Sequence, residues 1–456
     1  METFPAAKFY YTKLFLKFTY LLGIRNLFFK INQMSRHYPV LQRFKSFWKA
    51  LGPGLITGAS DDDPSAITTF SQAGARYGLA TLWMVIFAYP ILAVLQEMCA
   101  RIGIVTGKGL TGVIKTHYPK WVLYLLIILS CPAFLLNIGA DIAALGEAGN
   151  LLFPAVPALY CSIGFTLLLF ILIILLPYKK LAAVMKFLCL SLLVYVMVPF
   201  LTKQNPGLII RSTLIPSFHF DKDFLLIVTG ITGAIISPYL FFWQTSSQVE
   251  EMKLASLAKK RTKKYSFHLM RKDILAGAFF AVLIMYFIIL TTGTILYDHQ
   301  IYNIVTIKDA AVALKPLAGN LSYVLFSIGI IGTGFLIIPI LSASISYILT
   351  ETFNRESGLN KSLIEARLFY VIIAISMCFG VAMHWLHISA VKALLLTTIL
   401  YGITAPFLIG ILLHVSNNKK IMGEFRNGRL SNITGMIALL LMLATVIVLG
   451  YFLVIK

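Results

Sequence analysis

The chain has 456 residues, of which 59% are hydrophobic and only 12% are charged, and its net charge is +21. A soluble protein of this length would carry about twice that charged fraction, so a water-soluble globular protein is excluded. The surplus Lys and Arg residues fall in loops without zinc-finger or base-stacking patterns, so the expected partner is the lipid bilayer and not nucleic acid.

Residues 1–47 are expected to form a basic N-terminal segment in the cytoplasm. The stretch FYYTKLFLKFTYLLGIRNLFFKI carries a cation every few residues, which argues against a signal peptide. An interfacial amphipathic helix would fit the same pattern. Met34 offers a second start, which leaves open whether residues 1–33 belong to the native protein.

One transmembrane domain is predicted over residues 48–455, because the apolar stretches reach the roughly 20 residues that a helix needs to cross a bilayer. We expect an all-α polytopic membrane protein with eleven spans. They are placed at 50–76, 79–104, 121–150, 155–176, 181–201, 224–250, 274–297, 321–353, 366–388, 391–413 and 433–455.

The loop charges predict the orientation of the chain. Of the 39 Lys and Arg residues, 29 fall in loops on the N-terminal side of the predicted membrane and 8 on the other side. Positive loops face the cytoplasm, so the N-terminus is expected inside and the C-terminus outside.

The first predicted span contains GASDDDPSA at residues 58–66. A charge in mid-bilayer costs roughly 2.5–3.5 kcal/mol on insertion scales, so three adjacent carboxylates must face water, protein or a cation. Pro64 also removes a backbone donor. These features predict a broken helix, interrupted at 61–66.

The sixth predicted span repeats this pattern. It contains ITGAI at 231–235 followed by Pro238, and the first span contains ITGAS at 56–60 followed by Pro64. Five spans separate the two, an odd number, so the second copy enters the membrane from the opposite side. The pattern predicts an inverted repeat whose broken helices meet at the substrate site. Repeat one is placed at about 48–201, repeat two at about 224–413 and an extra helix at about 433–455.

The broken spans predict a site for a cation. Freed backbone carbonyls and three carboxylates give an anionic pocket rich in oxygen, which suits a divalent metal. The metal is expected as transported cargo, with no cofactor. An enzyme is not expected, since the sequence shows no nucleophile–base arrangement, phosphate loop or HExxH motif.

The stretch GPGLITGASDDDPSAITTFSQAGARYG, followed by EMCARIGIVTGKGL at 97–110, resembles the start of the Nramp divalent-metal transporters. The resemblance extends over roughly 48–455. It implies a LeuT-like fold of two inverted five-helix repeats and one further helix.

The resemblance also implies a set of metal ligands. Asp63 takes the place of the family's metal-binding aspartate, whereas Ala66 replaces its asparagine and Ser237 replaces its methionine. The family's carbonyl ligands fall at Ser60 and Ala234, a helix-10 glutamine falls at Thr398, and Asp61 and Asp62 are candidates for holding metal-bound waters. Loss of the soft sulfur ligand favours Mg²⁺ or Mn²⁺, as in the Nramp-related magnesium transporters.

The proton path of the family is altered in this chain. Its two helix-6 histidines fall on Tyr239 and Gln244, which do not titrate near neutral pH. Asp141 matches the helix-3 aspartate of the family, whereas the glutamate that follows it in the family falls on Ala144 and Glu147 lies one turn further along.

The expected function is secondary transport of Mg²⁺ and/or Mn²⁺ across the cytoplasmic membrane of a bacterium, by alternating access and with weak or no proton coupling. The alternative is an ordinary Nramp symporter that moves Mn²⁺ or Fe²⁺ with protons. A channel, a metal-sensing receptor and an amino-acid carrier of the same fold remain weaker alternatives. The oligomeric state is left open, with a monomer as the simplest case.

Overall fold

The computed structural model describes residues 53–176, 180–181, 184, 193–201, 205–219, 221–257, 263–304, 306–315, 319–386 and 389–454. Within these ranges the ordered structure is helical and contains no strand. They belong to one compact unit, Pro53–Lys456. The predicted segment 1–47 and residues 182–183 and 185–192 of the predicted span 181–201 lie outside the described ranges.

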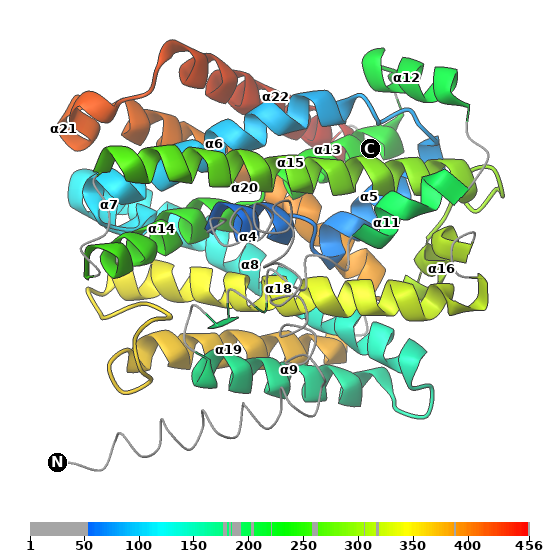
Figure 1. Ribbon diagram of the computed structural model, residues 1–456, viewed down its shortest axis with the longest axis horizontal. Helices are drawn as coiled ribbons and strands as arrows, with labels where there is room; N and C mark the ends of the chain where they lie inside the picture. Colours follow the sequence, from blue (N-terminus) through cyan, green and yellow to red (C-terminus); the bar gives the residue numbers. More distant parts are fainter. Residues whose placement is uncertain are drawn as a thin grey trace, which may run out of the picture. The chain divides into compact units, whose positions relative to one another are not determined.

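In Figure 1 the helices are coloured by their position in the sequence, from blue near the N-terminus to red at the C-terminus. The α-helices are α4 (Pro53–Ser60), α5 (Pro64–Tyr77), α6 (Met84–Thr106), α7 (Leu110–His117), α8 (Lys120–Leu152), α9 (Ala158–Leu175), α11 (Leu193–Met197), α12 (Pro206–Leu214), α13 (Lys222–Ile235), α14 (Tyr239–Leu257), α15 (Lys263–Ile295), α16 (Ile307–Ala311), α18 (Ser322–Thr352), α19 (Arg367–Ala382), α20 (Ala390–Asn417), α21 (Lys419–Met422) and α22 (Arg429–Val454). Short 3₁₀ turns lie at Val198–Leu201, Val312–Leu314, Gly319–Leu321, Met383–Leu386 and Gly423–Phe425.

Nine helical stretches in the described ranges are long and apolar enough to cross a membrane, and one of them, Lys222–Lys253, combines α13 with most of α14. They correspond to the second to fourth and the sixth to eleventh predicted spans. The first predicted span consists of α4 and α5, which are 8 and 14 residues long and are each too short to cross alone. Since residues 182–183 and 185–192 of the fifth span lie outside the described ranges, the total of eleven remains a prediction.

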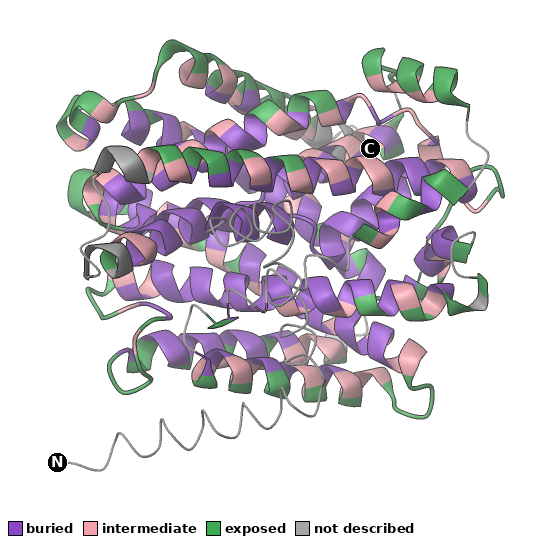
Figure 2. Ribbon diagram, viewed as in Figure 1, coloured by how far each residue is buried: buried purple, intermediate pink, exposed green. Residues whose placement is uncertain are grey.

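The broken helices lie in the core of the bundle. α4 and α5 both pack against α15, α13 packs against α20, and α8 packs against α18 and α9. Every residue of α4 is buried, as the purple ribbon shows in Figure 2. By contrast, only 22% of the apolar window of α9 and 17% of that of α22 are buried. The exposed apolar faces of α9 and α22 are those expected to contact lipid.

Two glycines bring the broken helices close to their neighbours. A Cβ on Gly58 of α4 would lie 2.3 Å from the carbonyl oxygen of Gly277 in α15. A Cβ on Gly233 of α13 would lie 2.1 Å from the carbonyl oxygen of Thr398 in α20. Small residues permit such close backbone contact between membrane helices, and here they fix each broken helix against a continuous one.

Candidate functional site at the two helix breaks

The first break is shorter than the sequence predicts. α4 ends at Ser60, and α5 begins at Pro64, with Asp63 as its extended N-cap residue. The interruption therefore covers Asp61–Asp63, and the prediction that it reaches residue 66 is wrong. The reason is that proline is favourable at the first position of a helix, where its missing N–H would have no partner in any case.

The Asp63 carboxylate is held by its own helix and by α8. Its Oδ1 accepts hydrogen bonds from the backbone N–H of Ala66 at 2.7 Å and from the hydroxyl of Ser65 at 2.5 Å. Its Oδ2 accepts one from the amide of Asn137 at 3.2 Å. Asp63 is only 3% exposed. The predicted metal ligand is thus oriented by three donors, which leaves about one lone pair, on Oδ2, for a cation.

The Asp61 carboxylate points towards other helices. Its Oδ1 accepts a hydrogen bond from the hydroxyl of Tyr239 in α14 at 2.9 Å, and its Oδ2 lies 3.5 Å from the amide Nε2 of Gln96 in α6. The Tyr239 hydroxyl also lies 3.3 Å from Ser60 Oγ. Asp61 is therefore oriented away from the partners of Asp63.

Asp62 lies between these two carboxylates and is 1% exposed. Its Oδ2 has no hydrogen-bond partner among the described protein atoms. Among the same residues, no group of three His, Cys, Asp or Glu side chains converges on a possible metal position. The three aspartates thus form an acidic segment whose side chains diverge, and any cation bound there needs ligands other than the three carboxylates together.

The second break lies between Ile235, the end of α13, and Tyr239, the start of α14. Ser237 lies inside it, and the Ser237 hydroxyl donates to the carbonyl oxygen of Ala234 at 2.8 Å. Both residues are buried. The predicted side-chain and carbonyl ligands of this break are therefore in direct contact with each other.

Contacts between α4 and α14 join the two breaks. Besides the Tyr239–Asp61 bond, the Thr57 hydroxyl of α4 lies 2.5 Å from Gln244 Oε1 of α14. Tyr239 and Gln244 are the positions at which the resemblance would place histidines. Here both side chains are used to hold the two broken helices together.

The remaining predicted residues lie around this centre. The Thr398 hydroxyl of α20 lies 3.2 Å from that of Thr69 in α5 and donates to Leu395. Asp141 of α8 is fully buried, and neither of its oxygens has a hydrogen-bond partner within the described ranges. Glu147 accepts a 3.4 Å hydrogen bond from the backbone N–H of Ala390, at the start of α20. The hydrogen bonds of Thr398 are thus with α5 and within α20, and that of Glu147 is with the start of α20; within the described ranges neither side chain hydrogen-bonds to Asp61, Asp62 or Asp63.

Asn137 and Gln96 were not predicted as site residues, although both contact the acidic segment. Each is fully buried in a long apolar helix. An amide side chain inside such a helix is a signal available from sequence, because a polar group within the membrane needs a partner.

Comparison with known proteins places the chain in a family. A family model described as "Natural resistance-associated macrophage protein-like" matches residues 54–452. The "Divalent metal cation transporter MntH" of Caldanaerobacter subterraneus is 25% identical over 398 residues, which are 86% of this chain and 90% of that protein. The protein of the same name from Bacillus subtilis is 25% identical and covers 85% of this chain and 88% of its own length.

Solved structures show the same fold. A crystal structure of the Eremococcus coleocola manganese transporter matches with a TM-score of 0.69 at 17% identity, over 90% of this chain and 87% of that one. The nucleobase-cation-symport-1 family transporter Mhp1 in a closed conformation matches with a TM-score of 0.55 at 12% identity, over 88% and 93%. The predicted LeuT-like transporter fold is confirmed, as is the expectation of a membrane transporter and not an enzyme. The family model matches most of the length of this chain, and the chain therefore belongs to the Nramp family.

Proposed function

We propose that the chain is a secondary transporter of divalent metal cations, Mg²⁺ and/or Mn²⁺, across the cytoplasmic membrane of a bacterium. The main observation behind this proposal is that the two helix breaks, which are far apart in sequence, are joined by the Tyr239–Asp61 hydrogen bond. This bond lies beside the buried acidic segment Asp61–Asp63. The relatives named divalent metal cation transporters support the cargo class. The metal is cargo, and no cofactor is proposed.

The proposed ligands are oxygens of the two breaks. Asp63 would bind the cation directly, together with the carbonyl groups of Ser60 and Ala234 and the hydroxyl of Ser237. Asp61 and Asp62 would bind water molecules that the cation keeps, and Thr398 would contribute from α20. An all-oxygen set suits Mg²⁺ and Mn²⁺ better than later transition metals.

Unpaired acceptors near the breaks support a cation that retains water. Asp62 Oδ2, Gln96 Oε1 and Asn137 Oδ1 are buried and have no donor among the described protein atoms. Leaving buried acceptors unpaired costs free energy. Water molecules on a Mg²⁺ ion would donate to such oxygens, and Mg²⁺ gives up its water reluctantly. This is the reason to rank Mg²⁺ beside Mn²⁺.

We further propose weak or no proton coupling, with the N-terminus inside and the C-terminus outside. Tyr239 and Gln244 stand where the family resemblance places histidines, and the loop charges favour this orientation. The second candidate is the proton-coupled Mn²⁺/Fe²⁺ symporter, in which Asp141 and Glu147 would carry the proton path. The buried Asp141 carboxylate, with no partner in the described ranges, is the observation that favours this candidate.

Metal uptake by reconstituted protein tests the proposed function. Full-length protein in liposomes, with a trapped metal-sensitive dye, should admit Mn²⁺, and Mg²⁺ in the outer solution should compete with it. Protein-free liposomes are the control. Uptake no faster than in that control contradicts the proposal, and Mn²⁺ uptake that a large excess of Mg²⁺ leaves unchanged contradicts the Mg²⁺ part.

A further inference from the structure

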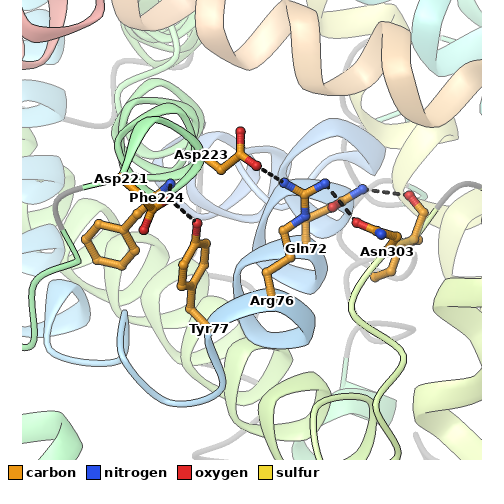
Figure 3. A network of polar contacts seen from close by, with 8 residues as sticks. Gln72, Arg76, Tyr77, Asp221, Asp223, Phe224 and Asn303 are labelled. Atoms are coloured by element: carbon orange, nitrogen blue, oxygen red, sulfur yellow. Dashed lines mark hydrogen bonds and ion pairs between the residues drawn. The ribbon is translucent and has the colours of Figure 1, made fainter. Parts of the chain in front are cut away.

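A cluster of polar contacts joins the two half-helices at the ends that face away from α4 and α14. Figure 3 shows it where the last turn of α5 meets the first turn of α13. We name it the outer cluster, because the loop charges assign this side to the outside. Its members are Gln72, Arg76, Tyr77, Asp221, Asp223 and Asn303.

One contact of the outer cluster uses a helix cap. The Tyr77 hydroxyl of α5 donates to Asp221 Oδ1 at 2.7 Å, and the same oxygen accepts the backbone N–H of Phe224 at 2.8 Å as the N-cap of α13. The slight burial of Asp221 acts to raise its pKa, but the hydrogen bonds from Tyr77 and Phe224 outweigh it and hold that pKa below its usual range. The Asp221 carboxylate is therefore charged at neutral pH and keeps both bonds.

Arg76 connects three elements. Its Nη1 lies 3.3 Å from Asp223 Oδ2 in α13, and its Nη2 donates to Asn303 Oδ1 at 2.9 Å. One turn earlier, Gln72 donates to the carbonyl oxygen of Ile304 at 2.7 Å. The segment 301–304, which follows α15, is thereby fixed on α5, and α5 is fixed on α13.

The charges of the outer cluster match the helix ends that carry them. Arg76 lies in the last turn of α5, where carbonyl groups give a partial negative charge, and Asp223 lies in the first turn of α13, where N–H groups give a partial positive one. Arg76 and Asp223 thus stabilise their own helices and also attract each other across the gap between the helices.

The opposite ends of the broken helices are held differently. Asp273 of α15 accepts the backbone N–H groups of Gly54 at 2.7 Å and Leu55 at 3.1 Å, and these bonds are buried. In the outer cluster the side chains of Arg76 and Asp223 are 33% and 63% exposed. Water competes for exposed polar contacts and leaves them weak, so the exposed contacts of Arg76 and Tyr77 are the ones that can break and re-form during a transport cycle, while the Gln72 bond to Ile304 is buried.

We propose that the outer cluster is a gate, in which Arg76, Tyr77 and Gln72 are positioning residues that hold α5, α13 and the segment 301–304 together when the outer route is closed. Opening to the outside breaks these contacts, and closing restores them. The proposal rests on transport of a divalent cation by alternating access, but it does not depend on which cation is carried.

Charge reversal tests the gate in metal-uptake kinetics. In Arg76→Glu the outward-open state is favoured, so the apparent KM for external Mn²⁺ should fall by about fivefold, within the usual range of coupling between sites. The maximal rate should fall as well, because closure is impaired. The pair Arg76→Glu/Asp223→Arg restores opposite charges and should bring both parameters back towards those of the unaltered protein.

The matched control for charge reversal is Arg211→Glu, at an exposed position of α12. It should leave KM and maximal rate unchanged. A purely structural role of Arg76 would lower the amount of active protein and the maximal rate without changing KM. An Arg76→Glu variant with an unchanged KM therefore overturns the proposal.

Reversible cross-linking tests the gate because loss and recovery of uptake are measured on the same preparation of folded protein. Tyr77→Cys/Asp221→Cys is treated with a reducible bifunctional thiol reagent and then with dithiothreitol. The cross-link should stop uptake, and the reductant should restore it, whereas the two single variants should respond to neither treatment. Full uptake by the cross-linked protein overturns the proposal.

Labelling separates failure of the gate from failure of the proposed function. Ser65→Cys, at the buried start of α5, is exposed in cells to a charged thiol reagent and labelling is read by mass spectrometry. Adding Arg76→Glu should raise the labelling rate at residue 65 by about fivefold or more. An equal rate contradicts the gate even if the protein carries no metal, while faster labelling, combined with no metal uptake by the unaltered protein, contradicts only the proposed function.

Discussion

Substitutions can separate the helix cap that Asp63 provides from its proposed role as a metal ligand. Asp63 caps α5 through the backbone N–H of Ala66, and it is the proposed ligand of the cation. Asparagine caps a helix as well as aspartate does, whereas alanine provides no cap. The two substitutions therefore differ in what they leave intact.

We expect Asp63→Asn to keep the thermal stability of the purified protein and to lower Mn²⁺ uptake by at least about tenfold. Asp63→Ala should lose uptake too, and should also lose about 1 kcal/mol of stability with the cap. Thermal unfolding in detergent and dye-monitored uptake are measured on the same preparations. Near-normal uptake by Asp63→Asn would remove Asp63 from the proposed ligands.

Residue 237 tests the preference for hard cations. Ser237→Met places a soft thioether beside the carbonyl group of Ala234, so competition against Mn²⁺ uptake should strengthen for Cd²⁺, Co²⁺ and Fe²⁺ and weaken for Mg²⁺. Ser237→Ala, which adds no sulfur, is the control. An unchanged order of competing metals shows that this side chain does not face the ion.

For single residues, the sequence predicted that the two breaks and their aspartates matter, but not which side chains contact them or how they point. The Asp61–Asp63 stretch was predicted as a cation site, and the structure buries all three residues. The divergence of their side chains depends on which helices pack around the break. Tyr239, Gln96 and Asn137 come from three different helices, and a single sequence does not show that they meet there.

The two broken helices were predictable as elements because glycine, proline and charge within an apolar span disfavour a continuous membrane helix. Their exact limits were not. Pro64 was expected to extend the break, but it begins α5, because the N-cap Asp63 and the fixed φ of proline favour a helix start there. The close packing of α13 on α20 depends on Gly233, whose small size has meaning only once its neighbour is known.

We expect Gly233→Ala to destabilise the protein by about 1–3 kcal/mol, because the added methyl group would overlap the backbone of Thr398 and Gly402. Gly410→Ala is the matched control, since Gly410 lies within α20 and a Cβ there meets nothing within 4 Å. The midpoints of thermal unfolding in detergent are compared. A Gly233→Ala variant as stable as Gly410→Ala would show that the contact between α13 and α20 readily relaxes.

For the whole molecule, the arrangement of contacts suggests how the proposed transporter would move. Buried hydrogen bonds hold the start of α4 against α15, while exposed contacts hold α5 and α13 together at the other side. The family and the LeuT-like fold could be predicted from the motifs at 51–110. The identity of the transported metal and the driving force for its transport could not be predicted from the sequence, because they depend on the protonation and hydration of groups around one small site.

Metal entry and proton entry, followed together, test the proposed mechanism most directly. Liposomes containing the full-length protein, a metal-sensitive dye and a pH-sensitive dye are given external Mn²⁺ at a clamped membrane potential. We expect the metal signal to rise with little or no internal acidification, since Tyr239 and Gln244 do not exchange protons near neutral pH. Asp141→Asn should then leave the pH record unchanged. Acidification that scales with metal entry and disappears in Asp141→Asn would contradict uncoupled transport and establish the proton-coupled symporter.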